Sequence, residues 1–139
     1  MFLLDTNVVS ELRRLSRADA NVVAWINGTG LARQFLSVVV FTELELGVRL
    51  TERRDQVHGA VLRRWLDGEV LPAFAGRILP VDVAVARCAA GLQVPNSRPI
   101  YDTLIAATAL VHDMTVVTRN VGDFQGTGAA VLNPWDAAA

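Results

Sequence analysis

Short apolar runs alternate with longer stretches of helical periodicity along the whole chain. Phe2-Leu3-Leu4, Phe35-Leu36 and Thr115-Val116-Val117-Thr118 are typical of buried strands, and shorter runs at 77–79 and 130–132 predict two more. Strands that are separated by helices favour parallel pairing, because a parallel pair needs a long crossover connection. The sequence therefore predicts an α/β fold, a central and mostly parallel β-sheet flanked by helices in an α/β/α sandwich.

The composition is that of one globular domain. The chain has 139 residues, 52% of them hydrophobic, and shows neither an internal repeat nor a linker. We therefore expect a single domain over residues 1–139. A formal net charge of -1 argues against bulk electrostatic binding of nucleic acid but leaves local basic clusters possible. Every basic residue except histidine is arginine, which suits phosphate contacts and is equally explained by coding bias.

The sequence favours a cytoplasmic protein. Its one cysteine, Cys88, excludes an internal disulfide and fits a reducing compartment. The opening Met1-Phe2-Leu3-Leu4-Asp5 lacks the basic and long apolar regions of a signal peptide. No run approaches the roughly 18 apolar residues of a membrane span, so no membrane association is expected.

Periodicity and capping residues locate the helices between the strands. Asn, Asp and Ser side chains accept hydrogen bonds from the first N–H groups of a helix, and Gly or Pro marks a boundary. The first expected helix is capped by Asn7 and carries Leu15, and the second is capped by Asp19 and has Gly28 near its end as a terminator. The third covers residues 38–50 and begins after Ser37 or Thr42, and the fourth covers residues 52–66. The last two run from Asp82 to Ala90 and from Pro99 to about Val111, and the latter is apolar nearly all round and should lie buried.

Four carboxylates interrupt or directly follow these apolar segments: Asp5, Glu43, Asp102 and Asp123. Asp5 and Asp123 come after predicted parallel strands, at the sheet edge where α/β proteins bind ligands. Asp102 lies in the first turn of a helix, and Glu43 borders the inward face of another, so both can reach the same edge. A buried carboxylate costs several kcal/mol unless it is paired or binds a cation. The four together predict one acidic pocket.

Such a pocket suits hard divalent cations. Carboxylate oxygens bind Mg²⁺ or Mn²⁺, and such ions position a phosphodiester, activate water and stabilise a leaving oxygen. Taken singly, each residue also has an ordinary reading, because Asp5 could cap a turn, Asp102 could complement a helix dipole and Asp123 could lie in a simple turn. Only the joint pattern favours a metal site.

The carboxylates lie in four segments that resemble, in order and over nearly the whole chain, a PIN domain of the VapC type. The opening residues 3–13 are most similar to the FitB-like branch of that family. The segments are Leu4-Asp5-Thr6-Asn7, Ser37-Val38-Val39-Val40-Phe41-Thr42-Glu43-Leu44-Glu45-Leu46-Gly47, Tyr101-Asp102-Thr103-Leu104-Ile105-Ala106-Ala107-Thr108-Ala109 and Val117-Thr118-Arg119-Asn120-Val121-Gly122-Asp123-Phe124.

The resemblance implies a metal-dependent endoribonuclease that is the toxin of a type II toxin–antitoxin system. It implies an RNA substrate, a cognate antitoxin protein and a homodimer or toxin–antitoxin hetero-oligomer, with Mg²⁺ as cofactor and Mn²⁺ as a substitute. The catalytic and metal-binding residues would be the four carboxylates, and Thr6, Thr118 and Asn120 would orient ligands or the attacking water. The sequence carries no signal for the substrate-binding residues or for which RNA is cleaved.

Two alternatives stay open. Asp5 could be a nucleophile, as in haloacid dehalogenase phosphatases or receiver domains, but Asn7 stands where the phosphatase motif has a second Asp, and the lysine of receiver domains is missing. The domain could instead be a non-catalytic PIN-like interaction module that binds a partner protein or RNA. Thermal stabilisation by a divalent cation separates the metal-dependent ribonuclease from the interaction module, because only a true metal site should show it.

Charged residues outside the quartet have simpler expected roles. Glu45 stands four residues before Arg49 and predicts a surface ion pair on the outer helix face. Arg98 and Arg119 lie near two of the carboxylates, where they would either contact RNA phosphate or neutralise the acidic pocket.

Overall fold

A computed structural model describes residues 1–136, and in it five strands form one parallel sheet. The strand order is β3-β2-β1-β4-β5. The predicted α/β fold with a central parallel sheet is therefore confirmed. The strands are β1 (Phe2–Leu4), β2 (Gln34–Ser37), β3 (Ile78–Leu79), β4 (Thr115–Val117) and β5 (Val131–Leu132).

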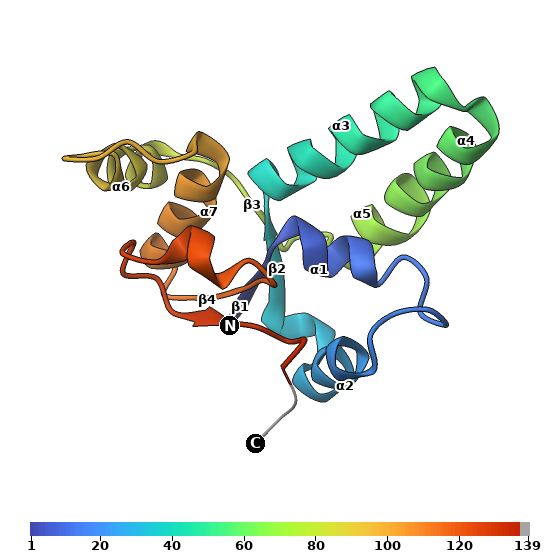
Figure 1. The fold of residues 1–139 in the computed structure, drawn as a ribbon, viewed down its shortest axis with the longest axis horizontal. Helices are drawn as coiled ribbons and strands as arrows, with labels where there is room; N and C mark the ends of the chain where they lie inside the picture. Colours follow the sequence, from blue (N-terminus) through green and yellow to red (C-terminus); the bar gives the residue numbers. More distant parts are fainter. Residues whose placement is uncertain (137–139) are drawn as a thin grey trace.

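Helices connect and flank the strands. In Figure 1, α6 and α7 lie to the left of the sheet, while α1, α4 and α5 lie to the right and α3 and α4 extend outward as a hairpin. Within residues 1–136, no helix is both long and apolar enough to cross a membrane. The helices are α1 (Thr6–Glu11), α2 (Ala20–Thr29), α3 (Val38–Arg54), α4 (Gln56–Trp65), α5 (Leu71–Ala73), α6 (Val83–Leu92) and α7 (Ile100–Val111), with short turns η1 (Leu31–Arg33), η2 (Leu66–Val70) and η3 (Val121–Phe124).

The sheet has its topological switch point between β1 and β4. The chain leaves β1 toward β2 on one side, whereas β4 pairs with β1 on the other, with Leu4 opposite Val117. The N–H of Asp5 continues this pairing by donating to the carbonyl oxygen of Val117 at 2.9 Å. Ligands of open α/β sheets bind at the carboxyl ends of strands on either side of such a point. The residues that follow β1 and β4 are therefore brought together by topology.

The core lies on both faces of this sheet. Leu3, Leu4, Val116 and Val117 are fully buried, as expected for central parallel strands. Helix α7 buries an unbroken run over residues 105–109. Its ends, however, are exposed, so the expectation that α7 is buried throughout is wrong at both termini, where the helix extends past its packing partners. The exposed end residues are Ile100, Tyr101 and Val111.

Two predicted helix boundaries are wrong. Asp5, not Asn7, caps α1, because the Asp5 backbone is extended and its carboxylate accepts from the N–H of Thr6 at 2.8 Å. Helix α1 ends at Glu11, and Leu15 is exposed. Helix α2 continues one residue past Gly28 and ends at Thr29; the next residue, Gly30, has a φ of 86°, a conformation that glycine adopts without steric cost. Asp19 and Asp82 cap α2 and α6 as predicted.

The predicted helix over 52–66 is interrupted. Helix α3 runs on to Arg54, and the chain turns at Asp55, which caps α4 by accepting from the N–H of His58 at 3.1 Å. The two helices then pack closely, because a Cβ added to buried Gly59 would lie 2.5 Å from the Cα of Glu52. Val57 is 80% exposed, so the apolar face predicted for this segment packs only in part on the core.

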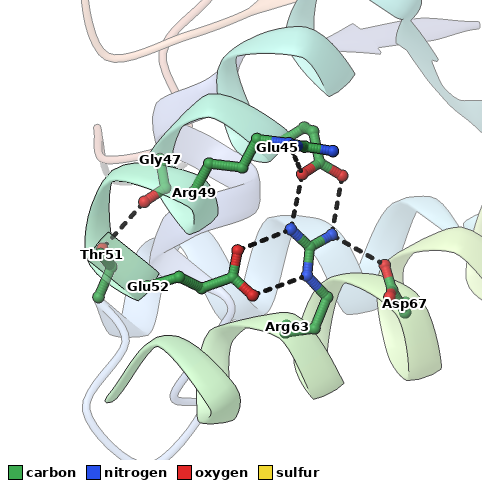
Figure 2. A network of polar contacts seen from close by, with 7 residues as sticks. All are labelled: Glu45, Gly47, Arg49, Thr51, Glu52, Arg63 and Asp67. Carbon is green, nitrogen blue, oxygen red and sulfur yellow. Dashed lines mark hydrogen bonds and ion pairs between the residues drawn. The ribbon is translucent and has the colours of Figure 1, made fainter. Parts of the chain in front are cut away.

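An ion-pair network joins α3 to α4 (Figure 2). The Arg63 guanidinium donates to both carboxylate oxygens of Glu45, at 2.8 and 2.7 Å, and to Glu52 at 3.0 and 3.3 Å. Asp67 lies 3.5 Å away on the next turn of the chain. The predicted Glu45–Arg49 pair is confirmed at 2.9 Å. Arg63 in α4 thus holds the two helices of the hairpin together through a bidentate contact with Glu45 in α3.

Candidate metal centre at the carboxyl edge of the sheet

Asp5 occupies the centre of this edge. It directly follows β1 and is only 7% exposed. Its Oδ1 accepts from the backbone N–H of Thr6 at 2.8 Å, and its Oδ2 accepts from the hydroxyl of Thr118 at 2.7 Å. The strand pairing of β1 with β4 therefore brings together two residues that the sequence predicted for the site.

The Thr118 hydroxyl has a fixed orientation. It is fully buried and accepts from the Asn7 side-chain amide at 3.2 Å and from the Asn120 N–H at 3.0 Å, so its proton points to Asp5. Asn120 takes part through its backbone; its side chain makes no hydrogen bond within residues 1–136. Asn7 was predicted only as a helix cap. Its position two residues after Asp5, in the first turn of α1, is the sequence signal that could have identified it as a residue of the site.

Glu43 reaches the same edge from α3. Ser37 fixes the start of this helix by accepting from the N–H of Val39 at 3.0 Å, so α3 begins directly after β2. One turn later, Oε1 of Glu43 accepts from the Thr6 hydroxyl at 2.9 Å. Thr6 thus contacts two of the carboxylates, Asp5 through its N–H and Glu43 through its hydroxyl.

Asp102 and Asp123 complete the acidic edge from the other side. Asp102 lies in the first turn of α7 and is half-buried, whereas Asp123 lies in η3 and is exposed. Within residues 1–136, no side chain or N–H group donates a hydrogen bond to either carboxylate. Their oxygens are therefore open toward solvent or a ligand.

Electrostatics link the four carboxylates. Burial raises the pKa of Asp5, hydrogen bonds from Thr118 and Thr6 lower it, and the charge of Asp123 raises it. Burial also raises the pKa of Glu43, opposed by the Thr6 hydroxyl and reinforced by the charges of Asp5 and Asp102. The pKa of Asp102 is raised by burial and then by the charges of Asp123 and Asp5. The raised pKa values of Asp5, Glu43 and Asp102 thus come first from burial and then from the charges of neighbouring carboxylates.

No arginine neutralises this charge among residues 1–136. Arg98 donates to the carbonyl oxygen of Gln125 at 2.8 Å, and the Arg119 guanidinium lies 5.1 Å from the centre of the Trp135 ring. None of the ion pairs of the described chain involves the quartet. Of the two roles left open for these arginines, neutralisation by direct pairing is absent from the described residues, and contact with RNA phosphate stays a prediction.

The donor set has the chemistry of a site for a hard cation. Oxygen ligands with uncompensated negative charge suit Mg²⁺ or Mn²⁺, whose charge removes the repulsion between them. As the side chains of residues 1–136 are arranged, no three acidic, histidine or cysteine groups are close enough to hold one ion jointly. Hydrogen bonds from Thr118 and Thr6 hold the Asp5 and Glu43 side chains in this arrangement.

A cavity of about 340 Å³ adjoins the acidic edge. Its polar lining residues include Thr6, Ser10, Arg13 and Glu43, and its apolar lining residues include Trp65. This space gives a ligand larger than a metal ion access to Glu43.

Comparison with known proteins identifies the family. Residues 2–128 match the protein family described as "PIN domain". The chain is 38% identical to VapC ribonuclease Y4jK of Sinorhizobium fredii over 99% of this chain and 100% of that protein, and 41% identical to toxin FitB of Neisseria gonorrhoeae over 97% and 99%. A crystal structure of FitAcB from Neisseria gonorrhoeae superposes with a TM-score of 0.88 at 41% identity, covering 97% of this chain and 99% of that one. The chain therefore belongs to the PIN domain family, as a protein of the VapC type similar to FitB.

Proposed function

We propose that the protein is a Mg²⁺- or Mn²⁺-dependent endoribonuclease that acts as the toxin of a type II toxin–antitoxin system. One observation carries the proposal: Asp5 and Glu43 both hydrogen-bond to Thr6 at the carboxyl edge of the sheet, and no ion pair of residues 1–136 includes a carboxylate of the quartet. The raised pKa values of Asp5, Glu43 and Asp102, caused first by burial and then by neighbouring carboxylates, agree with it. The names of the relatives, a VapC ribonuclease and a toxin, support the same activity.

The four carboxylates are the proposed metal ligands and catalytic residues. A bound cation would supply positive charge beside the scissile phosphate and activate a water molecule. Asp5 is held for this role by Thr118 and Thr6, and Glu43 is held by Thr6. Asn7 and the Asn120 N–H orient the Thr118 hydroxyl, so both act on the site through Thr118.

The proposed regulator is a cognate antitoxin, as the VapC type implies. A cavity of about 310 Å³ lined by Val9, Leu12 and Phe74 shares Arg13 and Trp65 with the cavity beside Glu43. We expect an antitoxin segment to occupy this groove and to place a basic side chain among the carboxylates. Substitutions that fill the groove at an exposed position, such as Leu15→Trp, should weaken inhibition by the antitoxin, whereas unchanged inhibition would contradict this placement.

Incubation of antitoxin-free protein with mixed cellular RNA tests the proposal. We expect cleavage with Mg²⁺ or Mn²⁺, loss of cleavage with EDTA, and loss in the Asp102→Asn variant. Sedimentation of the same sample measures whether the protein is the expected homodimer. Metal binding without cleavage of mixed RNA would indicate a narrow substrate.

The second candidate function is a non-catalytic PIN-like interaction module. The cavity beside Glu43 is large enough for a partner's side chains and so favours this reading independently of metal. If neither cleavage nor metal binding is observed while a partner protein or RNA still binds, the interaction module replaces the ribonuclease.

A further inference from the structure

Four arginines gather where the end of α1 faces α4. Arg13, Arg14 and Arg17 line one small cavity of about 180 Å³ with Ser10 and Glu11. Arg13 and Arg14 also line a second cavity, of about 360 Å³, together with Arg64 from α4. Arg13 and Arg14 therefore line both cavities, Arg17 lines the first and Arg64 lines the second.

These arginines are short of anionic partners. Within residues 1–136, none of the four guanidinium groups forms an ion pair or a hydrogen bond, in contrast to Arg63. The neighbouring carboxylates are Glu11, which accepts from the N–H of Asp19 at 2.9 Å, and Glu69, which lines the larger hollow. Burial and the charge of Arg14 lower the pKa of Arg13. The local charge is positive in a chain whose net charge is -1.

The cluster is continuous with the carboxylate edge. Arg13 also lines the cavity that contains Thr6 and Glu43, so one side chain borders both the acidic and the basic regions. The cavity beside Glu43 therefore shares Arg13 with both arginine-lined cavities. Arginine presents a planar fork that matches phosphate oxygens and stays charged at every relevant pH.

We propose that Arg13, with Arg14, Arg17 and Arg64, binds the phosphate backbone of the RNA strand that enters the carboxylate edge. This inference rests on the proposed ribonuclease function. RNA is favoured over an acidic peptide because the basic cluster begins at the edge where a phosphodiester is expected to lie, and because single-stranded nucleic acid carries phosphates at regular intervals. Arg13 is then a substrate-positioning residue, next to the metal ligands.

Binding measured without metal tests the inference. The probe is a short 2′-O-methyl RNA of mixed sequence, which resists hydrolysis, titrated in EDTA and followed by fluorescence anisotropy at several salt concentrations. We expect Arg13→Gln to weaken binding roughly tenfold and to reduce the slope of log affinity against log salt by about 0.7, the value for one lost contact to single-stranded RNA. Arg64→Gln should act in the same direction, and Arg13→Lys should retain part of the affinity.

The matched control is Arg87→Gln, because Arg87 is exposed on α6, on the other side of the sheet (Figure 1). It should leave both affinity and salt slope unchanged. Equal binding by wild type, Arg13→Gln and Arg64→Gln would overturn the inference, as would absence of binding by the wild type or displacement of the probe by a poly-glutamate peptide at far lower concentration than by RNA.

The cleavage assay separates this inference from the proposed function. Cleavage of cellular RNA with an unchanged KM in Arg13→Gln would leave the ribonuclease standing and remove the arginine site. Arginine-dependent RNA binding without any cleavage would support the arginine site and contradict the ribonuclease function. A thermal unfolding curve of each variant verifies that the substitution has left the fold intact.

Discussion

The hydroxyl of Thr118 donates a 2.7 Å hydrogen bond to the carboxylate of Asp5, joining the ends of β4 and β1. Both residues are buried, and the hydroxyl is itself held by Asn7 and by the N–H of Asn120. The contact fixes the orientation of the most buried candidate metal ligand before any cation binds.

Thr118→Val should therefore damage both stability and function. Valine has nearly the same shape but cannot donate, so Asp5, Asn7 and the Asn120 N–H all lose a partner. We expect a loss of about 1–3 kcal/mol in the free energy of unfolding, measured with urea, and slower RNA cleavage. The control is Thr108→Val: Thr108 is also buried, but its hydroxyl donates to the carbonyl oxygen of Leu104 in α7. Equal loss of cleavage in both variants would contradict a specific role for Thr118.

Asp102→Asn should stabilise the metal-free protein at neutral pH. Burial and the charges of Asp123 and Asp5 raise the pKa of Asp102 in the folded protein. A carboxyl of this kind contributes its full stability below its ordinary pKa and loses it as the pH rises through the raised native-state pKa. With EDTA present, we expect the Tm of the variant to exceed that of the wild type by a few degrees at pH 7, and the difference to shrink as the pH falls toward 4.

Asp113→Asn is the control for this pH series. Asp113 is exposed and has a φ of 53°, a conformation that asparagine also tolerates. Its substitution should leave the pH dependence unchanged. A Tm difference for Asp102→Asn that stays constant from pH 4 to pH 7 would show that the charge of Asp102 is not destabilising.

Gly59→Ala should loosen the α3–α4 hairpin. A Cβ at this position meets the backbone of Glu52 at 2.5 Å, and backbone atoms cannot move aside without separating the helices. We expect the free energy of unfolding to fall by about 1–3 kcal/mol. Gly47→Ala in α3 is the matched control, because a Cβ there meets no atom within 4 Å, and it should stabilise by about 0.5–1 kcal/mol. Equal effects of the two substitutions would contradict the close packing.

Arg63→Gln tests the ion pairs that join α3 to α4 in the same hairpin. The substitution removes contacts to Glu45, Glu52 and Asp67 together, so their charges are left to repel one another. We expect the Tm to drop by a few degrees at low salt and by less at high salt. Arg64→Gln, one residue further on and without such partners in residues 1–136, should change the Tm little. A loss that does not depend on salt would point to packing of the side chain rather than to its charge.

The strands and two helix caps could be predicted from the sequence because local rules determine them. Short apolar runs specify the strands, and Asp19 and Asp82 cap helices through N–H groups only two or three residues away. The position of Asp5 at the end of an apolar run was sufficient to expect its burial, whereas Asp102 is half-buried and Asp123 is exposed.

Contacts between distant residues could not be predicted in the same way. The bond from Asn7 to Thr118 spans 111 residues and exists only because β1 pairs with β4. The sequence revealed the Glu45–Arg49 pair at helical spacing, but the stronger bidentate contact comes from Arg63, 18 residues away, across a turn at Asp55 that the pattern did not show. For the same reason, only the tertiary structure shows that Arg13 and Arg14, which follow α1, lie near Arg64 in α4.

Titration of the metal-free protein with Mn²⁺, with the free ion observed by electron paramagnetic resonance, tests the proposed metal site most directly. We predict binding by the wild type and affinities weakened at least about tenfold in Asp5→Asn, Glu43→Gln, Asp102→Asn and Asp123→Asn. Glu45→Gln, two residues from Glu43 but turned to Arg63, should bind Mn²⁺ like the wild type. A wild-type protein that leaves millimolar Mn²⁺ free, or four carboxylate variants that bind as tightly as it does, would contradict a metal site at the carboxyl edge of the sheet.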